Sequence, residues 1–106
     1  MRRHSRASGA IAINYTLAPG IGFQLHEIRI HLNAAGGAGD LTVTLTAAAG
    51  AVYNQVVLTQ EMTLEIDYIY QPPQAHDFLA GDELVFAWPN ANVRTYGMEI
   101  VWSATP

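Results

Sequence analysis

Hydrophobic and polar residues alternate with a period of two along most of this 106-residue chain. Successive side chains of a β-strand point to opposite faces of a sheet, so the alternation predicts strands with one buried face. No segment keeps helical spacing for long enough to predict a helix. The pattern predicts eight strands between turn signals, at residues 11–17, 22–32, 41–46, 52–58, 62–70, 78–79, 84–88 and 93–102.

The second of these segments changes phase in its middle. Phe23 and Leu25 fall on odd positions, whereas Ile28 and the apolar residues that follow it fall on even positions. One extra, unpaired residue in a strand produces such a shift, and this arrangement is a β-bulge. We therefore expect a bulge at His26 or Glu27.

The segment 62–70 carries the longest strand signal. Its apolar residues Met62, Leu64 and Ile66 alternate with polar ones, and the run ends just before Pro72-Pro73. Proline gives a sheet no backbone donor and restricts the residue before it to extended shapes. We expect one continuous strand from residue 62 to residue 70.

Short strands with a turn signal about every ten residues are typical of β-sandwiches and barrels. Several connections are too long for simple hairpins, which favours an all-β, antiparallel, jelly-roll-like β-sandwich of about eight strands over an immunoglobulin-like arrangement. The sandwich is expected to span residues 10–106 as one domain. Residues 1–9 are expected to precede it as an extended basic arm.

The positive charge of the chain is concentrated in that arm. Three of the five arginines of the chain, Arg2, Arg3 and Arg6, lie there, and the chain has no lysine. Because these three contribute +3 to a net charge of −4, the remainder carries −7, which excludes general attraction to nucleic acid or anionic membranes. We expect Arg2, Arg3, His4 and Arg6 to bind a partner protein, since guanidinium groups pair with carboxylates.

The rest of the surface is expected to carry little charge. Only 13% of residues are charged, against about 25% in typical soluble domains. Thr42, Thr44 and Thr46 alternate with buried-type residues and form an outward row, which we predict to contact a partner. A small monomer with a neutral surface is the alternative that this composition leaves open.

Candidate catalytic and metal-binding groups are few. There is no cysteine, so disulfides and thiolate metal sites are excluded. His26 and His31 do not have the spacing of a zinc motif, and the aspartates of the turns, Asp40, Asp77 and Asp82, suit backbone capping better than calcium binding. We expect no enzyme activity, no cofactor and no metal.

The aromatic residues admit two interpretations. Flat rings could form a platform for sugars, as in carbohydrate-binding β-sandwiches. Each ring is nevertheless in phase with aliphatic residues of its own strand, which favours packing in the core. The residues concerned are Tyr68, Tyr70, Trp88, Tyr96 and Trp102.

Four stretches give the chain a family resemblance: FQLHEIRIHL, GGAGDLTVTL, LAGDELVFAWPNAN and TYGMEIVW. They resemble the jelly-roll decoration, or cement, proteins of tailed bacteriophage heads. The resemblance implies a non-enzymatic structural protein that is made in the host cytoplasm and binds the outside of the virion capsid. Its partners would be the major capsid protein and further copies of itself, with a trimer favoured, and the N-terminal arm would contact neighbouring subunits; no nucleic acid or membrane is implied.

Two other functions remain compatible with the sequence. A carbohydrate-binding β-sandwich module would expose a planar set of aromatic rings. A structural component of a phage tail or neck would use the same β fold in a ring-forming oligomer.

Overall fold

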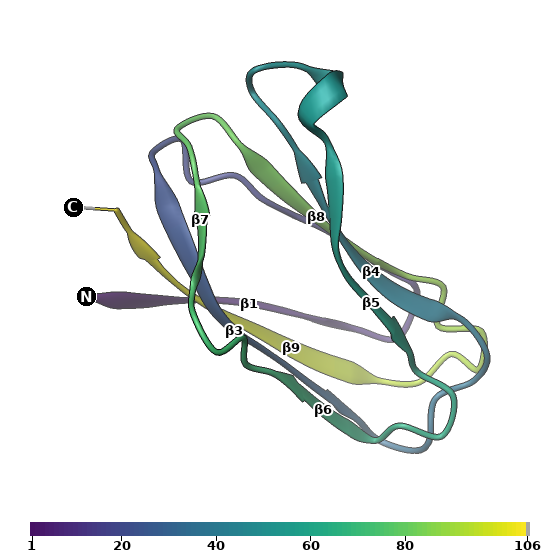
Figure 1. The fold of residues 1–106 in the computed structure, drawn as a ribbon. Helices are drawn as coiled ribbons and strands as arrows, with labels where there is room; N and C mark the ends of the chain where they lie inside the picture. The colour runs from purple at the N-terminus through teal and green to yellow at the C-terminus, as the bar shows by residue number, and fades with distance from the viewer. Residues whose placement is uncertain (106) are drawn as a thin grey trace.

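The computed structural model describes residues 1–105, and almost all of its regular secondary structure is β-strand (Figure 1). One short 3-10 helix, η1 (Ala51–Tyr53), interrupts them. The strands are β1 (Arg2–Gly9), β2 (Ile13–Leu17), β3 (Phe23–Leu32), β4 (Asp40–Thr46), β5 (Gln55–Glu61), β6 (Asp67–Tyr70), β7 (His76–Phe78), β8 (Glu83–Trp88) and β9 (Tyr96–Ala104).

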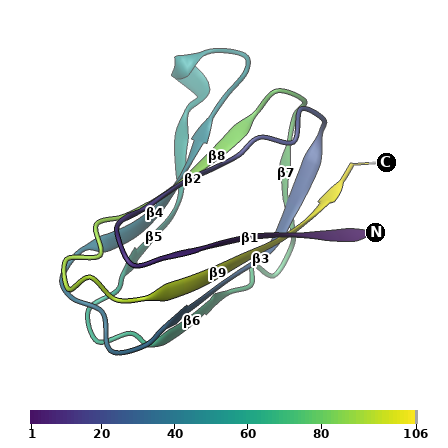
Figure 2. The ribbon, with the colours of Figure 1, turned by 180° about the vertical axis from the view of Figure 1, so that it is seen from behind.

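The strands form two antiparallel sheets that face each other (Figures 1 and 2). Sheet A has the order β1-β9-β3-β6, with β7 also paired to β3, and sheet B has the order β2-β8-β4-β5. If β6 and β7 are counted as two parts of one strand position beside β3, each sheet has four positions, and their orders, β1-β9-β3-β6 and β2-β8-β4-β5, are those of a jelly roll. The predicted all-β sandwich with jelly-roll-like topology is therefore confirmed.

The bulge expected in β3 is present. The register between β3 and β9 shifts between Leu25 and Glu27, which leaves His26 without a register partner. His26 remains attached to β9 through its side chain, because its Nε2 lies 2.7 Å from the hydroxyl oxygen of Ser103. The extra residue lets apolar side chains face the core on both sides of the bulge.

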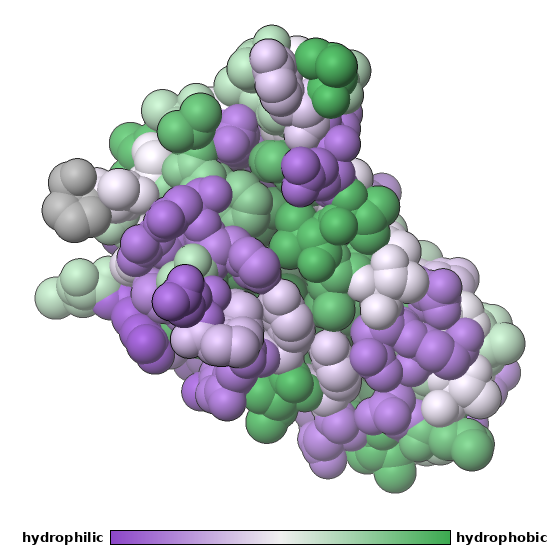
Figure 3. Space-filling model, in the orientation of Figure 1, coloured by the Kyte–Doolittle hydropathy of each residue, from purple (hydrophilic) through white to green (hydrophobic). Residues whose placement is uncertain are grey.

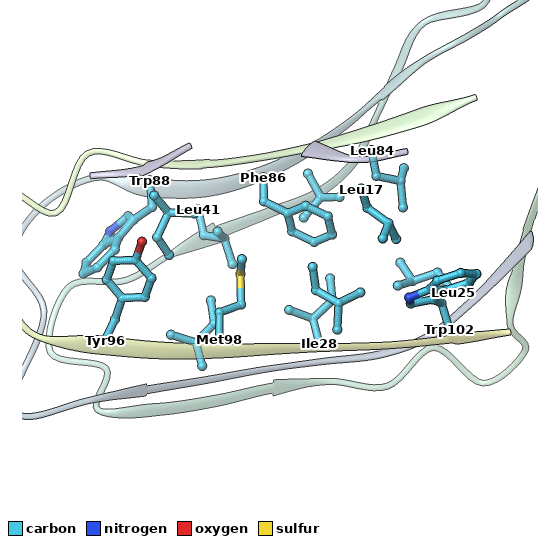
Figure 4. Packing of buried hydrophobic residues seen from close by; sticks show 14 of the residues in the cluster. Leu17, Leu25, Ile28, Leu41, Leu84, Phe86, Trp88, Tyr96, Met98 and Trp102 are labelled. Atoms are coloured by element: carbon cyan, nitrogen blue, oxygen red, sulfur yellow. The ribbon is translucent and has the colours of Figure 1, made fainter. Parts of the chain in front are cut away.

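The core lies between the sheets and is built from the alternating apolar positions (Figure 4). Figure 4 shows Phe86 and Leu84 of β8 directed toward Ile28 and Leu25 of β3. The rings of Trp88, Tyr96 and Trp102 are also buried, and Tyr68 and Tyr70 pack against this cluster. The core interpretation of the aromatic residues is thus confirmed.

The strand expected at 62–70 is shorter than predicted and begins only at Asp67. Leu64 has a φ of 67°, a left-handed conformation that no strand can contain. Its backbone N–H donates to Gly36 O at 3.0 Å, and the N–H of Glu65 donates to Met62 O at 3.1 Å. Residues 62–66 thus form a turn that docks on the loop before β4, a long-range contact that alternation does not reveal.

Residues 2–9, expected as an arm outside the domain, form strand β1. It pairs with β9 along its whole length, from Arg2 opposite Ser103 to Gly9 opposite Tyr96. The segment is extended, as expected, but it occupies the first strand position of the jelly roll. Its inward-facing residues are mostly small or polar, so the sequence lacks the apolar alternation that marks the other strands.

Candidate functional site

Two of the predicted partner-binding residues of the N-terminal segment pair within the domain. His4 Nδ1 donates to Glu99 Oε1 at 2.7 Å, and Arg6 Nε donates to Glu99 Oε2 at 2.9 Å. These hydrogen bonds lower the pKa of the Glu99 carboxyl below its usual value, Arg6 contributing most. The carboxylate that Arg6 was expected to find on a neighbouring protein is therefore supplied by β9.

The two remaining arginines of the segment also lie against sheet A. Arg3 places its guanidinium 5.2 Å from the centre of the Trp102 ring, a cation–π arrangement. The indole N–H of Trp102 donates to the Ser5 hydroxyl at 3.0 Å. Arg2 is exposed. The pKa of His26 is lowered, mainly by burial of the imidazole and to a smaller extent by the charge of Arg2.

The threonine row lies in the other sheet, away from β1. Thr42 and Thr44 are half-buried on β4 between β8 and β5, and Thr46 is exposed at the end of the strand. Their neighbours across β8 are Ala87 and Val85. The outward orientation expected for Thr42 and Thr44 agrees with their partial exposure next to the buried Leu41 and Val43. The structure does not bring this row together with the arginines.

The aspartates of the predicted turns lie in three different places. Asp82 accepts hydrogen bonds from the backbone N–H groups of Ala48 and Leu79, both at 2.9 Å, so it acts as the expected turn cap. Asp77 accepts from Gln24 Nε2 at 2.7 Å. Asp40 lies beside Glu61, and its pKa is raised, chiefly by desolvation. Within residues 1–105, no three histidine or acidic side chains gather in a metal-binding group.

One side of the sandwich is open between β5 of sheet B and β7 of sheet A. A cleft of about 640 Å³ lies there. Apolar side chains line most of it, and Figure 3 shows a hydrophobic patch between β7 and β5 that is bordered by hydrophilic residues. The lining includes Leu45, Tyr53, Val56, Val57, Phe78 and Leu79.

The rim of this cleft is unusual because large apolar side chains remain in water. Val56 is 61% exposed, Tyr53 60% and Leu79 72%. β5 is also an edge strand of its sheet, so it has backbone groups available for pairing. The cleft combines an apolar surface with a free strand edge, and this combination suits a partner segment in extended conformation. We refer to this surface as the β5–β7 cleft.

A second hollow lies on the outer face of sheet A and has a volume of about 580 Å³. Gly97 of β9 lies at its floor, and a Cβ atom at this position would meet no atom within 4 Å. Charged groups surround this floor: Arg6, Arg29, His31, Asp67 and Glu99. We refer to this hollow as the Gly97 groove.

Ion pairs hold the charged side chains of the Gly97 groove in place. His31 Nδ1 donates to Asp67 Oδ1 at 2.5 Å, and Arg29 Nη1 lies 3.7 Å from Glu99 Oε1. Arg29 also forms an ion pair through Nε with the buried carboxylate of Glu27, whose Oε1 accepts a hydrogen bond from the Gln71 side chain.

This groove could not be predicted from the sequence, because its residues come from four strands that become neighbours only in the folded sheet. The one local signal was Gly97, a glycine on the polar side of an otherwise well-patterned strand. A glycine at such a position weakens a strand and often marks the close approach of a ligand or another backbone.

Comparison with known proteins gives no family assignment. No protein-family model matches the chain, and no curated protein matches it. Among solved structures, one described as "Family 16 Carbohydrate Binding Module-2" has a TM-score of 0.47 and 16% identity, covering 92% of this chain and 74% of that one. A chain from the structure of infectious bursal disease virus Gx strain has a TM-score of 0.36 and 12% identity, covering 97% of this chain and 29% of that one.

No helix in residues 1–105 is long and apolar enough to cross a membrane.

Proposed function

We propose that the protein is a non-enzymatic virion component that attaches to the outer surface of a tailed-phage capsid and stabilises it. The β5–β7 cleft is the attachment surface in this proposal. A segment of the major capsid protein would lie along β5 and cover the apolar rim. The sequence resemblance to phage decoration proteins and the jelly-roll topology agree with this function, but the proposal depends mainly on the cleft.

The observation that carries the proposal is the exposure of large apolar side chains at the rim. Each keeps apolar area in water that a partner could bury, at about 25 cal/mol for each Å² removed. Monomeric proteins seldom expose contiguous apolar surface of this kind unless it binds something. The rim residues Tyr53 and Val56 are close in sequence, whereas Leu79 follows β7 of the other sheet, so the sandwich brings Leu79 to the rim beside them.

Attachment at this surface would stabilise the capsid without covalent chemistry. A protein that binds only the assembled lattice shifts the equilibrium toward that lattice by mass action. The expected homo-oligomer, with a trimer favoured, would add avidity because several clefts would bind at once. The N-terminal segment has a smaller role than the sequence suggested, since His4 and Arg6 are already paired with Glu99.

Co-sedimentation with expanded phage heads that lack decoration protein tests the proposal. The double variant Val56→Asp/Leu79→Asp places two charges at the rim and should lose at least tenfold in apparent affinity. Leu64→Asp is the matched control, because Leu64 is also exposed but does not line the cleft. Circular dichroism should show that all the chains remain folded.

Three outcomes count against the proposal. They are failure of the native chain to sediment with heads, binding of the double variant equal to that of the native chain, and an equal loss of binding in Leu64→Asp. Binding to isolated tails or necks in place of heads would favour a tail or neck component that uses the same cleft.

A further inference from the structure

We propose that the Gly97 groove is a binding site for a short neutral saccharide. The groove shares no lining residue with the β5–β7 cleft, so this site goes beyond the capsid attachment proposed above. Its volume of about 580 Å³ lies within the usual range of small-molecule sites, about 300–1,000 Å³.

The shape of the groove follows from the arrangement of residues on the outer face of sheet A. Gly97 pairs with Ser8 on one side and His31 on the other, and His31 pairs in turn with Asp67. Side chains therefore rise around Gly97 but not from it. The neighbouring row, which contains Glu99, forms one wall.

The side chains around the floor of the groove supply both hydrogen-bond donors and hydrogen-bond acceptors. Arg6 and Arg29 each direct Nε to a carboxylate, and their side chains remain more than half exposed to water. A guanidinium has five N–H donors, so both retain donors that can face the groove. His31 uses Nδ1 for Asp67, which leaves its Nε2 for a ligand, and a carboxylate such as Asp67 can accept more than one hydrogen bond.

The charges select a neutral ligand. The two arginines that line the groove are balanced by Asp67 and Glu99. A phosphate or sulfate would be attracted by the arginines but repelled by the carboxylates that are paired with them. A protonated amine would be attracted by the carboxylates but repelled by the arginines. Hydroxyl groups both donate and accept, so a polyhydroxyl compound can use both kinds of partner without a net charge.

An apolar contact completes the match to a saccharide. Ile69 of β6 lines the groove and is 58% exposed. The C–H face of a pyranose ring is apolar, so it can lie against this aliphatic side chain while the ring hydroxyls reach the charged wall. This site needs no aromatic platform, which agrees with the burial of Trp88, Tyr96 and Trp102.

A glycan array probed with the full chain tests the inference. The chain would carry a C-terminal biotin and be displayed on streptavidin, so that weak contacts gain avidity. We expect retention on neutral saccharides and not selectively on sulfated, phosphorylated or sialylated ones. Titration of the free chain with the retained saccharide would then give its affinity.

Gly97→Val is the decisive variant. A Cβ at this position meets no atom within 4 Å and valine suits a strand, so the variant should fold, occupy the floor of the groove and lose at least tenfold in affinity. His31→Ala should weaken binding between about twofold and tenfold, the worth of one hydrogen bond. Ala87→Val, a similar enlargement on the outer face of sheet B, is the matched control and should bind normally.

The inference is overturned if no neutral saccharide is retained, if only anionic glycans are retained, or if Gly97→Val binds within twofold of the native chain. Its failure is separable from failure of the capsid proposal. Gly97→Val should sediment with phage heads like the native chain, because Gly97 does not line the β5–β7 cleft.

Discussion

Arg6 and Glu99 are direct register partners across the β1–β9 pair, and Arg6 Nε donates to Glu99 Oε2 at 2.9 Å. His4, two residues earlier on the same strand, donates to the other oxygen of the same carboxylate. One acidic residue of β9 therefore fixes two basic residues of β1. Because the pairing is internal, the basic N-terminus belongs to the sandwich and contributes to its stability.

The Glu99 carboxylate should make the free energy of unfolding decrease as the pH is lowered. Its folded pKa lies below the unfolded value, because Arg6 and His4 stabilise the charged form. At a pH between the folded and the unfolded pKa, the folded state binds fewer protons than the unfolded state. The contribution of Glu99 to the free energy of unfolding is therefore fully present above the unfolded pKa and is lost as pH falls through the folded pKa. Urea unfolding from pH 7 to pH 3 should show this loss in the native chain.

Glu99→Gln is the control for that pH dependence. It keeps the shape of the side chain and removes the titrating group, so its stability should fall less between pH 5 and pH 3. The two curves should approach each other at the acid end. Parallel curves over the whole range would show that Glu99 does not contribute through its charge.

Deletion of residues 2–9 should destabilise the fold, because it removes a whole strand. β9 would lose its hydrogen-bonded neighbour, and the indole N–H of Trp102 would lose the Ser5 hydroxyl. We expect a loss on the order of 3 kcal/mol or more, since each backbone hydrogen bond contributes about 1 kcal/mol net. Thermal unfolding followed by circular dichroism measures it, and an unchanged midpoint would show that the segment is a dispensable arm.

The sequence predicted the features that depend on apolar alternation. The bulge at His26 follows from a phase shift between Leu25 and Ile28, and the core positions follow from the alternation in β3, β4, β8 and β9. These features are local in sequence because a strand with one buried face repeats every two residues. The lengths of the connections between the predicted strands favoured a jelly roll, although the eight predicted strands did not include β1.

Features that depend on pairing between distant segments could not be predicted. Strand β1 has no apolar face, because its inward positions contact only the edge of the core through Arg3, Ser5 and Ala7. The apolar alternation at 62–66 is misleading, since Leu64 is exposed in a turn fixed by Gly36. Both binding surfaces assemble from several strands, so no short motif marks them.

Trp88→Ala should cost about 3–5 kcal/mol, because it removes a large buried side chain from the core. Trp88 is only 2% exposed and packs in the cluster between the sheets. Trp88→Phe should cost clearly less, because the buried indole N–H has no hydrogen-bond partner within residues 1–105 and its removal leaves no new unpaired group. Chemical unfolding measures both losses, with the exposed Tyr53→Ala as control. A loss below 1 kcal/mol for Trp88→Ala would contradict the core assignment.

Val93→Gly should raise stability by about 0.5–1 kcal/mol. Val93 has a φ of 52°, in the left-handed region, where a residue with a side chain is strained by about 1–2 kcal/mol and a β-branched one is a genuine outlier. Its side chain is 65% exposed, so little packing is lost, and the greater freedom of glycine in the unfolded chain offsets only part of the gain. Val52→Gly, at an exposed position of η1 without a positive φ, is the matched control and should lower stability. Chemical unfolding of both variants decides the matter, because equal destabilisation would mean that the turn at Val93 imposes no backbone strain.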